Sequence, residues 1–411
     1  MLLYIIAVLL TGQYFLDAVL EYLNSLKRSE KLPYELKGVW DEEKYRKSVL
    51  YEQVNRRFSL ITGAFNLVLI LLMLFLGGFA LADNIAQGIA GHPVAVSLLF
   101  FGMLMLASDI VNIPFQVYHT FVIEERFGFN KTTPSVFVTD KLKGWLLSII
   151  IGGGLLALVT WFYLLTTEWF WVFAWITAGL FMIFMNMFYS TLIVPLFNKQ
   201  TPLEEGELKQ EIGEMARKTD FQLDDVFVID GSKRSSKSNA YFAGLGRKKR
   251  IVLFDTLIND LKNNEIVAVL CHEIGHFKKK HIRTGLVISL ITTGFSLWLL
   301  SLFIDNPQLS QALGAEEASF HMGLLAFSIL YTPVSTVIGI FTNILSRKNE
   351  FEADRFAAVR HNPDDLAGAL KKLSAKNLSN LTPHPAYVFF NYSHPPLLKR
   401  LKALEVAEKE G

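Results

Sequence analysis

Seven long apolar stretches constrain the fold of this chain more than any other feature. Each contains about the 20 predominantly apolar residues that a helix needs to cross the hydrocarbon core of a bilayer. The whole chain is 51% hydrophobic and only 19% charged, which is too apolar for an ordinary soluble enzyme. The sequence therefore predicts a mainly α, polytopic membrane protein with seven transmembrane helices. The stretches cover approximately residues 2–23, 61–82, 95–118, 144–166, 169–197, 284–304 and 320–345.

Two of these stretches have unusual ends. The first begins at Met1 without a basic segment and has no clear small-residue cleavage site, so we expect a retained helix and not a signal peptide. The fifth is long and contains Asn186 and Pro195, so it can continue beyond the lipid.

The basic residues of the loops predict the orientation in the membrane. Loops 24–60 and 119–143 carry lysine and arginine, and the alternate loops that carry neither are 83–94, 167–168 and 305–319. By the positive-inside rule the N-terminus is outside, in the lumen or periplasm, and the C-terminus is cytosolic. Segments 198–283 and 346–411 then lie together on the cytosolic side. We expect the inner or plasma membrane in a prokaryote and the endoplasmic reticulum membrane in a eukaryote.

Some predicted spans contain polar side chains, namely Asp17 in the first and Asp109, Asn112 and Gln116 in the third. A charge near the bilayer centre costs about 2.5–3.5 kcal/mol on insertion scales. These residues therefore face either a watery interior or a hydrogen-bonding partner on another helix, and the sequence favours neither.

Residues 272–276 read His-Glu-Ile-Gly-His, an H-E-x-x-H pattern that follows a run of good helix formers with a cap candidate at Asn263 or Asn264. On a helix, His272 and His276 project from one face about one turn apart, so both imidazoles can reach one Zn²⁺. Glu273 then lies near the same metal, where it can take a proton from a bound water. Two ordinary surface histidines are an equally good explanation of the pattern by itself.

A zinc peptidase site needs a third protein ligand. A third histidine six residues after His276 would fall at Ile282, so that class of site is excluded. Glu350 and Asp354 instead form an i, i+4 pair on one face of a later helix. Glu350 would bind the metal, and Asp354 would accept the second N–H of a ligand histidine. Glu352 points roughly to the opposite side and is treated as a non-ligand. The alternative, a solvated acidic helix face, is disfavoured by the upstream motif.

The chain contains one cysteine, Cys271, so an intrachain disulfide is excluded. We interpret Cys271 as a small buried hydrophobic residue and not as a metal ligand. The basic runs 247–250 and 278–280 look at first like nucleic-acid patches, but beside a membrane a headgroup-facing rim is the better interpretation. We expect membrane lipid, and no nucleic acid, as a partner.

Region 198–283 reads as a small α/β unit. It contains a charged helix at 203–218 and strands at 226–229, 238–244 and 250–254. A sheet edge beside the H-E-x-x-H helix is where an extended peptide could add as a strand. The predicted organisation is transmembrane helices in 1–197, a protease part in 198–283, two more transmembrane helices in 284–345 and a cytosolic part with the third ligand in 346–411.

These residues resemble the integral-membrane CaaX prenyl protease type 1 family, zinc metalloproteases that process the C-termini of prenylated proteins and the yeast a-factor precursor. The resemblance covers the whole chain, including the seven spans. The matching motifs are 231–236, 238–242, 250–257, 272–276, 350–354 and 393–396 with Arg400.

The resemblance implies a ring of seven helices around a water-filled chamber, with a gluzincin-type zinc-protease domain on the cytosolic face. It implies one Zn²⁺ held by His272, His276 and Glu350, with Glu273 as the general base. Asn239 matches a position that binds substrate backbone. His394 and Arg400 match positions near the scissile bond or the substrate carboxyl terminus, although the residues alone read as surface groups. The compact chain fits a prokaryotic member.

The sequence thus predicts metal-assisted hydrolysis of peptides near the C-terminus of prenylated proteins. Glu273 would transfer the proton, and His394 would stabilise the oxyanion. Two alternatives remain open: a quality-control protease for misfolded or translocon-stalled membrane proteins, and a membrane scaffold or transporter with a vestigial metal site. The intact Glu273 weighs against the second, because structural zinc needs no base.

Overall fold

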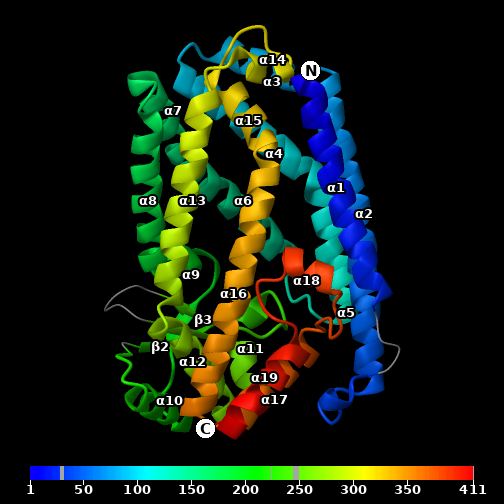
Figure 1. Ribbon diagram of the computed structural model, residues 1–411, viewed down its shortest axis with the longest axis vertical. Coiled ribbons are helices and arrows are strands. Elements are labelled where there is room, and N and C mark those ends of the chain that lie inside the picture. Colours follow the sequence, from blue (N-terminus) through cyan, green and yellow to red (C-terminus); the bar gives the residue numbers. More distant parts are fainter. Residues whose placement is uncertain (28–31, 224, 244–249, 411) are drawn as a thin grey trace.

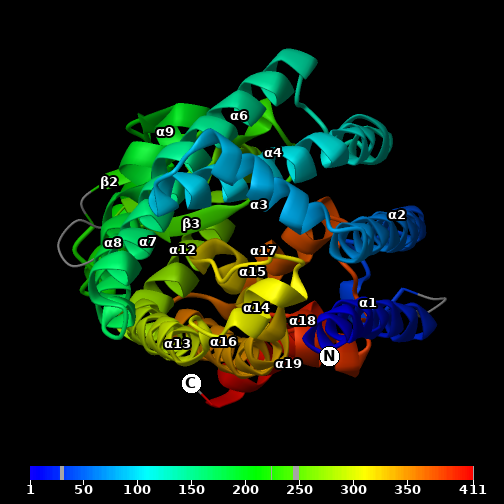
Figure 2. The ribbon, with the colours of Figure 1, turned by 90° about the horizontal axis from the view of Figure 1, so that it is seen from above.

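The computed structural model describes residues 1–27, 32–223, 225–243 and 250–410. In this part of the chain six helical stretches are long and apolar enough to cross a membrane, and a bent pair of helices makes a seventh. Seen from above, they are arranged as a ring (Figure 2). The mainly α, polytopic fold is therefore confirmed. The stretches are Leu2–Leu26, Glu42–Phe75, Pro93–Phe127, Pro134–Thr166, Phe170–Phe197, His281–Phe303 and the pair Phe320–Leu330 with Thr332–Arg360.

Three of these stretches contain a short π-helical segment between two α-helices, and the others are single helices. The composite stretches are α4 (Pro93–Tyr118), η2 (His119–Glu124) and α5 (Glu125–Phe127); α6 (Pro134–Leu147), η3 (Ser148–Gly153) and α7 (Gly154–Thr166); and α8 (Phe170–Phe188), η4 (Tyr189–Ile193) and α9 (Val194–Phe197). The single helices are α1 (Leu2–Leu26), α2 (Glu42–Phe75), α13 (His281–Phe303), α15 (Phe320–Leu330) and α16 (Thr332–Arg360).

The second predicted span, 61–82, is wrong at its C-terminal end. Helix α2 stops at Phe75, and Gly77, with a φ of +72°, turns the chain into the separate helix α3 (Gly78–Ile89). Glycine adopts this left-handed conformation without the steric penalty that a Cβ brings. Because residues 76–82 are as apolar as the helix before them, hydropathy could not locate this turn.

The seventh predicted span, 320–345, is broken. Helices α15 and α16 meet at an angle of 52° next to Tyr331. Pro333 lies in the first turn of α16, where its missing N–H removes a hydrogen bond that a continuous helix would require. The bend redirects α16 so that its far end reaches the soluble part of the molecule (Figure 1).

Two of the four polar residues predicted within the spans bond between helices. Asp109 of α4 accepts hydrogen bonds from Lys141 Nζ at 2.6 Å and Trp145 Nε1 at 2.7 Å, both on α6. Asn112 and Asn66 exchange amide hydrogen bonds of 3.1 Å between α4 and α2. The other two residues bond within their own helices, Gln116 to Asp109 at 3.0 Å and Asp17 to Gln13 at 3.2 Å. Of the two explanations left open by the sequence, helix–helix hydrogen bonding describes Asp109 and Asn112.

The end of the ring near the N-terminus is closed by short elements. Helix α3, helix α14 (Pro307–Ala312) and helix α15 lie across it (Figure 1). Asp83 of α3 and His321 of α15 are 2.7 Å apart, and each side chain is 5% exposed. The C-terminus lies at the opposite end, beside the soluble part.

The soluble part contains a four-stranded sheet with the order β1-β2-β4-β3. The strands β2 and β4 run parallel, and the other two pairs are antiparallel, which leaves β3 at an edge. The three predicted strands are confirmed within the described residues. The fourth, β1, was missed because three residues are too few to show a strand period. The strands are β1 (Gln200–Pro202), β2 (Asp225–Ile229), β3 (Ala240–Ala243) and β4 (Arg250–Phe254).

The predicted helix at 203–218 begins later than expected. Helix α10 spans Glu207–Lys218, because the backbone N–H of Leu203 still bonds to the carbonyl of Val226 beside the sheet. Of the two predicted basic runs, residues 247–249 lie outside the described part of the chain. Lys278 ends helix α12 (Asn263–Lys278), and Lys279 and Lys280 form the turn after it.

Helix α12 lies at the centre of the soluble part. Ten of its residues, Glu265–His272 together with Ile274 and Gly275, are buried. The seven apolar ones, Ile266–Cys271 and Ile274, belong to a core that includes residues of α10, β2, β4, α16 and two C-terminal helices. The remaining helices of this part are α11 (Asp255–Asp260), α17 (Pro363–Lys376), α18 (Pro385–Asn391) and α19 (Leu397–Glu410).

Gly275 sets the distance between α12 and α16. A Cβ at this position would lie 3.1 Å from the Cα of Ala353 and 3.2 Å from the Cβ of Phe356. Both are close to rigid backbone, so neither neighbour can yield as a flexible side-chain end would. A larger residue here would therefore push the two helices apart by a few tenths of an ångström or more.

Replacing Gly275 with valine should destabilise the protein, although glycine is itself about 1 kcal/mol worse than alanine in a helix. We expect the overpacking to cost about 1–3 kcal/mol, seen as a lower midpoint of thermal unfolding. Gly213 of α10, which has no atom within 4 Å of a built Cβ, is the matched control. Gly213→Val should leave the midpoint unchanged or raise it, since valine is no worse than glycine in a helix. An unaltered midpoint in Gly275→Val would show that the helices can move apart freely.

Candidate active site

Helix α12 carries the H-E-x-x-H residues, and its start differs from the prediction. The helix begins at Asn263, so neither Asn263 nor Asn264 is the residue before it; that position is Lys262. The carboxylate of Glu265 accepts the backbone N–H of Lys262 at 2.8 Å. Lys372 of α17 donates to the same carboxylate at 2.7 Å. A side chain three residues into the helix thus satisfies a backbone donor that the predicted asparagine cap would not.

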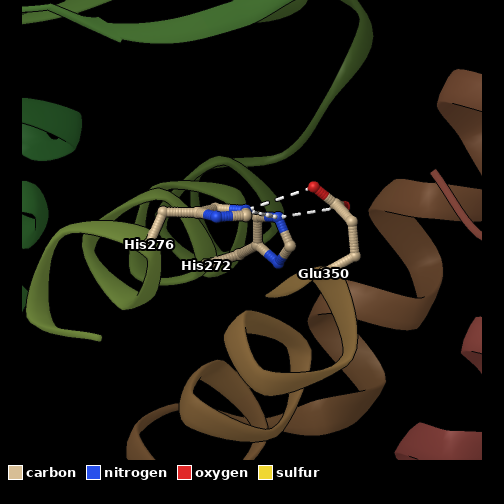
Figure 3. Close-up of side chains that lie close together, drawn as sticks. All are labelled: His272, His276 and Glu350. Atoms are coloured by element: carbon tan, nitrogen blue, oxygen red, sulfur yellow. Dashed lines mark hydrogen bonds and ion pairs between the residues drawn. The ribbon is translucent and has the colours of Figure 1, made fainter. Parts of the chain in front are cut away.

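The three predicted ligand side chains converge from two helices (Figure 3). His272 and His276 project from α12, and Glu350 projects from α16. The Nε2 atoms of the histidines are 3.2 Å apart. Oε1 of Glu350 is 3.3 Å from His276 Nε2, and Oε2 is 3.6 Å from His272 Nε2. Among the described residues these three form the group able to hold a metal ion.

These spacings fit a tetrahedral zinc site. Zinc binds imidazole nitrogen and carboxylate oxygen at about 2.0–2.1 Å, so two corners of a zinc tetrahedron lie about 3.3 Å apart. The three separations of 3.2–3.6 Å match that edge. Two imidazoles and a carboxylate are also the donor types that catalytic zinc takes, with the fourth position left for water. The donor set and its spacing therefore suit the predicted metal.

Asp354 lies directly behind His272. Its Oδ1 is 2.9 Å from His272 Nδ1, and its side chain is only 1% exposed. The other partner of Asp354 is Arg400, whose Nε and Nη2 donate to the two carboxylate oxygens at 2.8 and 2.6 Å. This geometry places Asp354 where it can fix the ring of His272 so that Nε2 faces Glu350.

The sequence around Arg400, taken without the family resemblance, indicated a surface residue, and the structure shows that this is wrong. Its side chain is 11% exposed, and Nη1 is 3.3 Å from Oε2 of Glu350. The guanidinium therefore holds both buried carboxylates of α16 at once. Burial lowers the pKa of Arg400, but the hydrogen bond to Asp354 and the negative charges of Asp354, Glu350 and Glu273 together raise it, so the group stays charged. Its role in binding substrate stays a prediction.

His394 lies on the other side of Glu350. Its Nδ1 is 3.0 Å from Oε2 of Glu350, while 66% of its side chain is exposed. The bond to Glu350 raises the pKa of His394, against the effect of burial. The histidine thus combines a fixed orientation with a face open to a neighbouring molecule.

A cavity of about 490 Å³ opens in front of the metal-binding group. Glu273, His276 and His394 line one side, and the edge strand β3 contributes residues 240–242 to another. Glu273 therefore faces the same space as the ligands, as its predicted role requires. Asn239, at the start of β3, lines two adjoining cavities and accepts the N–H of Ala240 with its own side chain at 2.9 Å.

The sequence did not assign a role to His281, which the structure places against the site. Its Nδ1 is 3.1 Å from Nδ1 of His276, and its Nε2 is 3.2 Å from Oε2 of Glu352. Glu352 is thus engaged away from the metal-binding group. The signal in the sequence was a third histidine five residues after the motif, which becomes informative only once the turn between α12 and α13 is known.

Cys271 takes no part in the metal-binding group. It is fully buried in the core around α12, and burial raises the pKa of its thiol to about 12. A thiol with such a pKa remains protonated at neutral pH, whereas a metal ligand must be a thiolate.

Known proteins share this architecture. Residues 22–199 match the family described as CAAX prenyl protease N-terminal, five membrane helices, and residues 202–408 match peptidase family M48. CAAX prenyl protease 1 of Saccharomyces cerevisiae is 37% identical over 97% of this chain and 94% of its own length. The Homo sapiens homolog is 32% identical over 93% of this chain and 90% of its own. A crystal structure of S. mikatae Ste24p has a TM-score of 0.92 and 36% identity, covering 98% of both chains.

These relatives are eukaryotic, and the chain covers 90–94% of the two sequences just described. Its length therefore does not distinguish it from eukaryotic members, and the size argument for a prokaryotic origin fails. The resemblance itself is confirmed by the two family matches, by the relatives and by the solved structure. The chain belongs to the CAAX prenyl protease family within peptidase family M48, and it is a multi-pass membrane metalloprotease.

Proposed function

We propose that this protein is a membrane-embedded zinc endopeptidase that hydrolyses peptide bonds near the C-terminus of prenylated, CaaX-type proteins. The observation that supports this best is the convergence of His272, His276 and Glu350 to 3.2–3.6 Å in front of a cavity. The relatives compared above are named CAAX prenyl protease 1 and align along nearly the whole chain.

In this proposal His272, His276 and Glu350 hold one zinc ion. When bound, zinc polarises the scissile carbonyl and lowers the pKa of a water in the open position. Glu273 takes the proton of that water as general base and returns it to the leaving amine. The exposed face of His394 donates a hydrogen bond to the oxyanion, since the residue is held on its other side by Glu350.

The edge strand β3 supports an extended substrate. Among the described strands it pairs with β4 alone, so its outer edge can accept a peptide that adds as a further strand. Residues 240–242 of β3 line the same cavity as Glu273. A peptide in that position would pass the predicted base, and Asn239 at the start of the strand would bind its backbone.

A second cavity supports the preference for a lipidated substrate. It has a volume of about 900 Å³ and extends from β3 to the membrane helices, and its apolar lining includes Met185, Val194, Phe197, Ile229, Phe242 and Ile282. A prenyl chain is apolar and gains free energy when it leaves water. Burying each additional 100 Å² of it would contribute about 2.5 kcal/mol.

The proposal also includes an orientation. Helix α12, which carries two of the predicted ligands, lies in the half of the molecule that contains the C-terminus, and the N-terminus lies at the other end (Figure 1). With the basic loops inside, the C-terminal end is cytosolic, where prenylated proteins are found, and the N-terminus is lumenal or periplasmic. The membrane is that of the endoplasmic reticulum in a eukaryotic cell, or the inner membrane in a prokaryotic one. Membrane lipid is the other partner, and no nucleic acid is expected.

Glu273→Gln should keep zinc but lose peptide cleavage, because the amide cannot accept the proton of the water. We expect kcat to fall by at least 10²-fold, in the range typical of general-base catalysis. Zinc content, measured by elemental analysis, should stay near one per chain. Glu214→Gln on the exposed face of α10 is the control and should change neither quantity. Cleavage at the normal rate by Glu273→Gln would remove this residue from the mechanism.

Glu350→Ala should lose the metal, because two histidines alone do not hold catalytic zinc. The expected result is a zinc content close to zero after dialysis against a weak chelator. Glu405→Ala on α19 serves as the control and should retain one zinc. Full retention of zinc by Glu350→Ala would show that another residue is the third ligand.

A farnesylated CaaX peptide should be cleaved in a zinc-dependent manner and preferred over the same peptide without the lipid. Burial of about 100 Å² of the prenyl chain would lower KM by about 60-fold, since 1.4 kcal/mol corresponds to a factor of ten. The comparison uses purified full-length protein in detergent or lipid. Equal KM values for the two peptides would instead favour a quality-control protease, which has no need of the lipid.

A further inference from the structure

His281 contacts the back of a predicted zinc ligand. It is the first residue of α13, and its Nδ1 lies 3.1 Å from Nδ1 of His276. Its other ring nitrogen, Nε2, lies 3.2 Å from Oε2 of Glu352 on α16. The side chain of His281 is only 8% exposed. The three residues therefore form a chain of contacts that leads from the metal-binding group to a carboxylate.

The directions of the hydrogen bonds follow from the metal-binding role of His276. Its Nε2 faces His272 and Glu350, so this nitrogen must be unprotonated to bind a metal, and the proton of the neutral ring is on Nδ1. His276 Nδ1–H then donates to Nδ1 of His281. That leaves the proton of His281 on Nε2, from which it donates to the carboxylate of Glu352. Every donor in this chain meets an acceptor.

The backbone between α12 and α13 brings His281 into this position. In a continuous helix, a residue five positions after His276 would lie about 140° around the axis and would not touch it. Instead Lys280 has a φ of +62°, in the left-handed region, and α13 starts immediately after it. A residue with a Cβ in that conformation is strained by about 1–2 kcal/mol. The strained turn is what places the ring of His281 behind His276.

The two predicted zinc histidines are thereby supported in parallel ways. Behind His272 the carboxylate of Asp354 is in direct contact, at 2.9 Å from Nδ1. Behind His276 an imidazole stands between the ring and the carboxylate of Glu352. A carboxylate behind a ligand histidine fixes its ring and makes it a stronger ligand, and loss of such a partner typically weakens metal binding by about 10–100-fold.

We propose that His281 and Glu352 are positioning residues of the metal site: His281 fixes the ring of His276 through its Nδ1, and Glu352 fixes His281. This rests on the proposed zinc ligands His272, His276 and Glu350. Both ring nitrogens of His281 are engaged, so it is neither a further ligand nor a proton donor to substrate. Glu352, which the sequence set aside as a non-ligand, thus acts on the metal through two histidines.

The test is the dissociation constant of zinc, measured by competition with a chromophoric chelator on purified, metal-free, full-length protein. His281→Phe keeps the size of the ring but removes both hydrogen bonds, and it should weaken zinc binding by about 10–100-fold. His281→Asn places an amide oxygen near the position of Nδ1, where it can still accept from His276, and should recover most of the affinity. The midpoint of thermal unfolding of the metal-free protein should be the same in both variants.

Glu352→Ala tests the outer end of the chain and should weaken zinc binding by several-fold. Glu352 is 40% exposed, so this variant folds even if His281→Phe does not. Lys348→Ala is the matched control: this 72% exposed lysine lies 3.8 Å from Oε1 of Glu352, whereas His281 contacts Oε2, and its removal should leave zinc affinity unchanged.

Three results would overturn the proposal: wild-type affinity in His281→Phe, wild-type affinity in Glu352→Ala, or equal losses in His281→Phe and His281→Asn with normal unfolding of the metal-free protein. Each of these results can be told apart from a wrong assignment of the zinc ligands. That assignment is tested by the zinc affinity of Glu350→Ala in the same assay. Retention of zinc by Glu350→Ala means that the metal site itself is assigned wrongly. Loss of zinc from Glu350→Ala, together with wild-type zinc affinity in His281→Phe, rejects only the positioning role of His281.

Discussion

The close approach of α12 and α16 is the contact on which the metal site depends. The two histidines lie on α12 and the glutamate lies on α16. The Glu350 oxygens come within 3.3 and 3.6 Å of the histidine Nε2 atoms because Gly275 leaves no side chain between the two helices. The glycine is within the His-Glu-Ile-Gly-His sequence, one residue before His276. The motif therefore contains two predicted ligands, a predicted base and the packing surface that brings the third predicted ligand close.

The charges buried around this contact suit a divalent cation. Glu273, Glu350 and Asp354 carry three negative charges and Arg400 one positive charge, so the group has a net charge of −2 when the histidines are neutral. Glu350 and Asp354 are 5% and 1% exposed at the side chain, and Arg400 is 11% exposed. Removing one member of a buried ion pair typically costs about 3–5 kcal/mol because the other charge is left uncompensated. Arg400 therefore ties α19 to the predicted metal site, and the remaining charge of −2 would be balanced by a divalent cation.

The sequence predicted those features whose signals are local. Apolar stretches long enough to span a membrane and an H-E-x-x-H pattern are visible in short windows, and both have their counterparts in the structure. The bend beside Tyr331, the turn at Gly77 and the strand β1 were missed, because a single proline or glycine, or three residues of strand, changes hydropathy very little. The contacts of Arg400 and His281 depend on elements that meet only after folding, so no residue spacing revealed them.

Helix α16 joins the two halves of the molecule, and this has a consequence for substrate access. The cavity in front of Glu273 is also lined by Ile288 of α13 and by Thr342 and Leu345 of α16, which precede Glu350 on the same helix. The metal site thus opens toward the membrane helices, and the polar ligands occupy one wall while aliphatic side chains form another. A substrate whose peptide bond lies close to an apolar group can place the peptide bond against the polar wall and the apolar group against the aliphatic wall. The bend next to Tyr331 directs α16 so that its polar end reaches α12, and the same bend sets how the apolar wall meets the site.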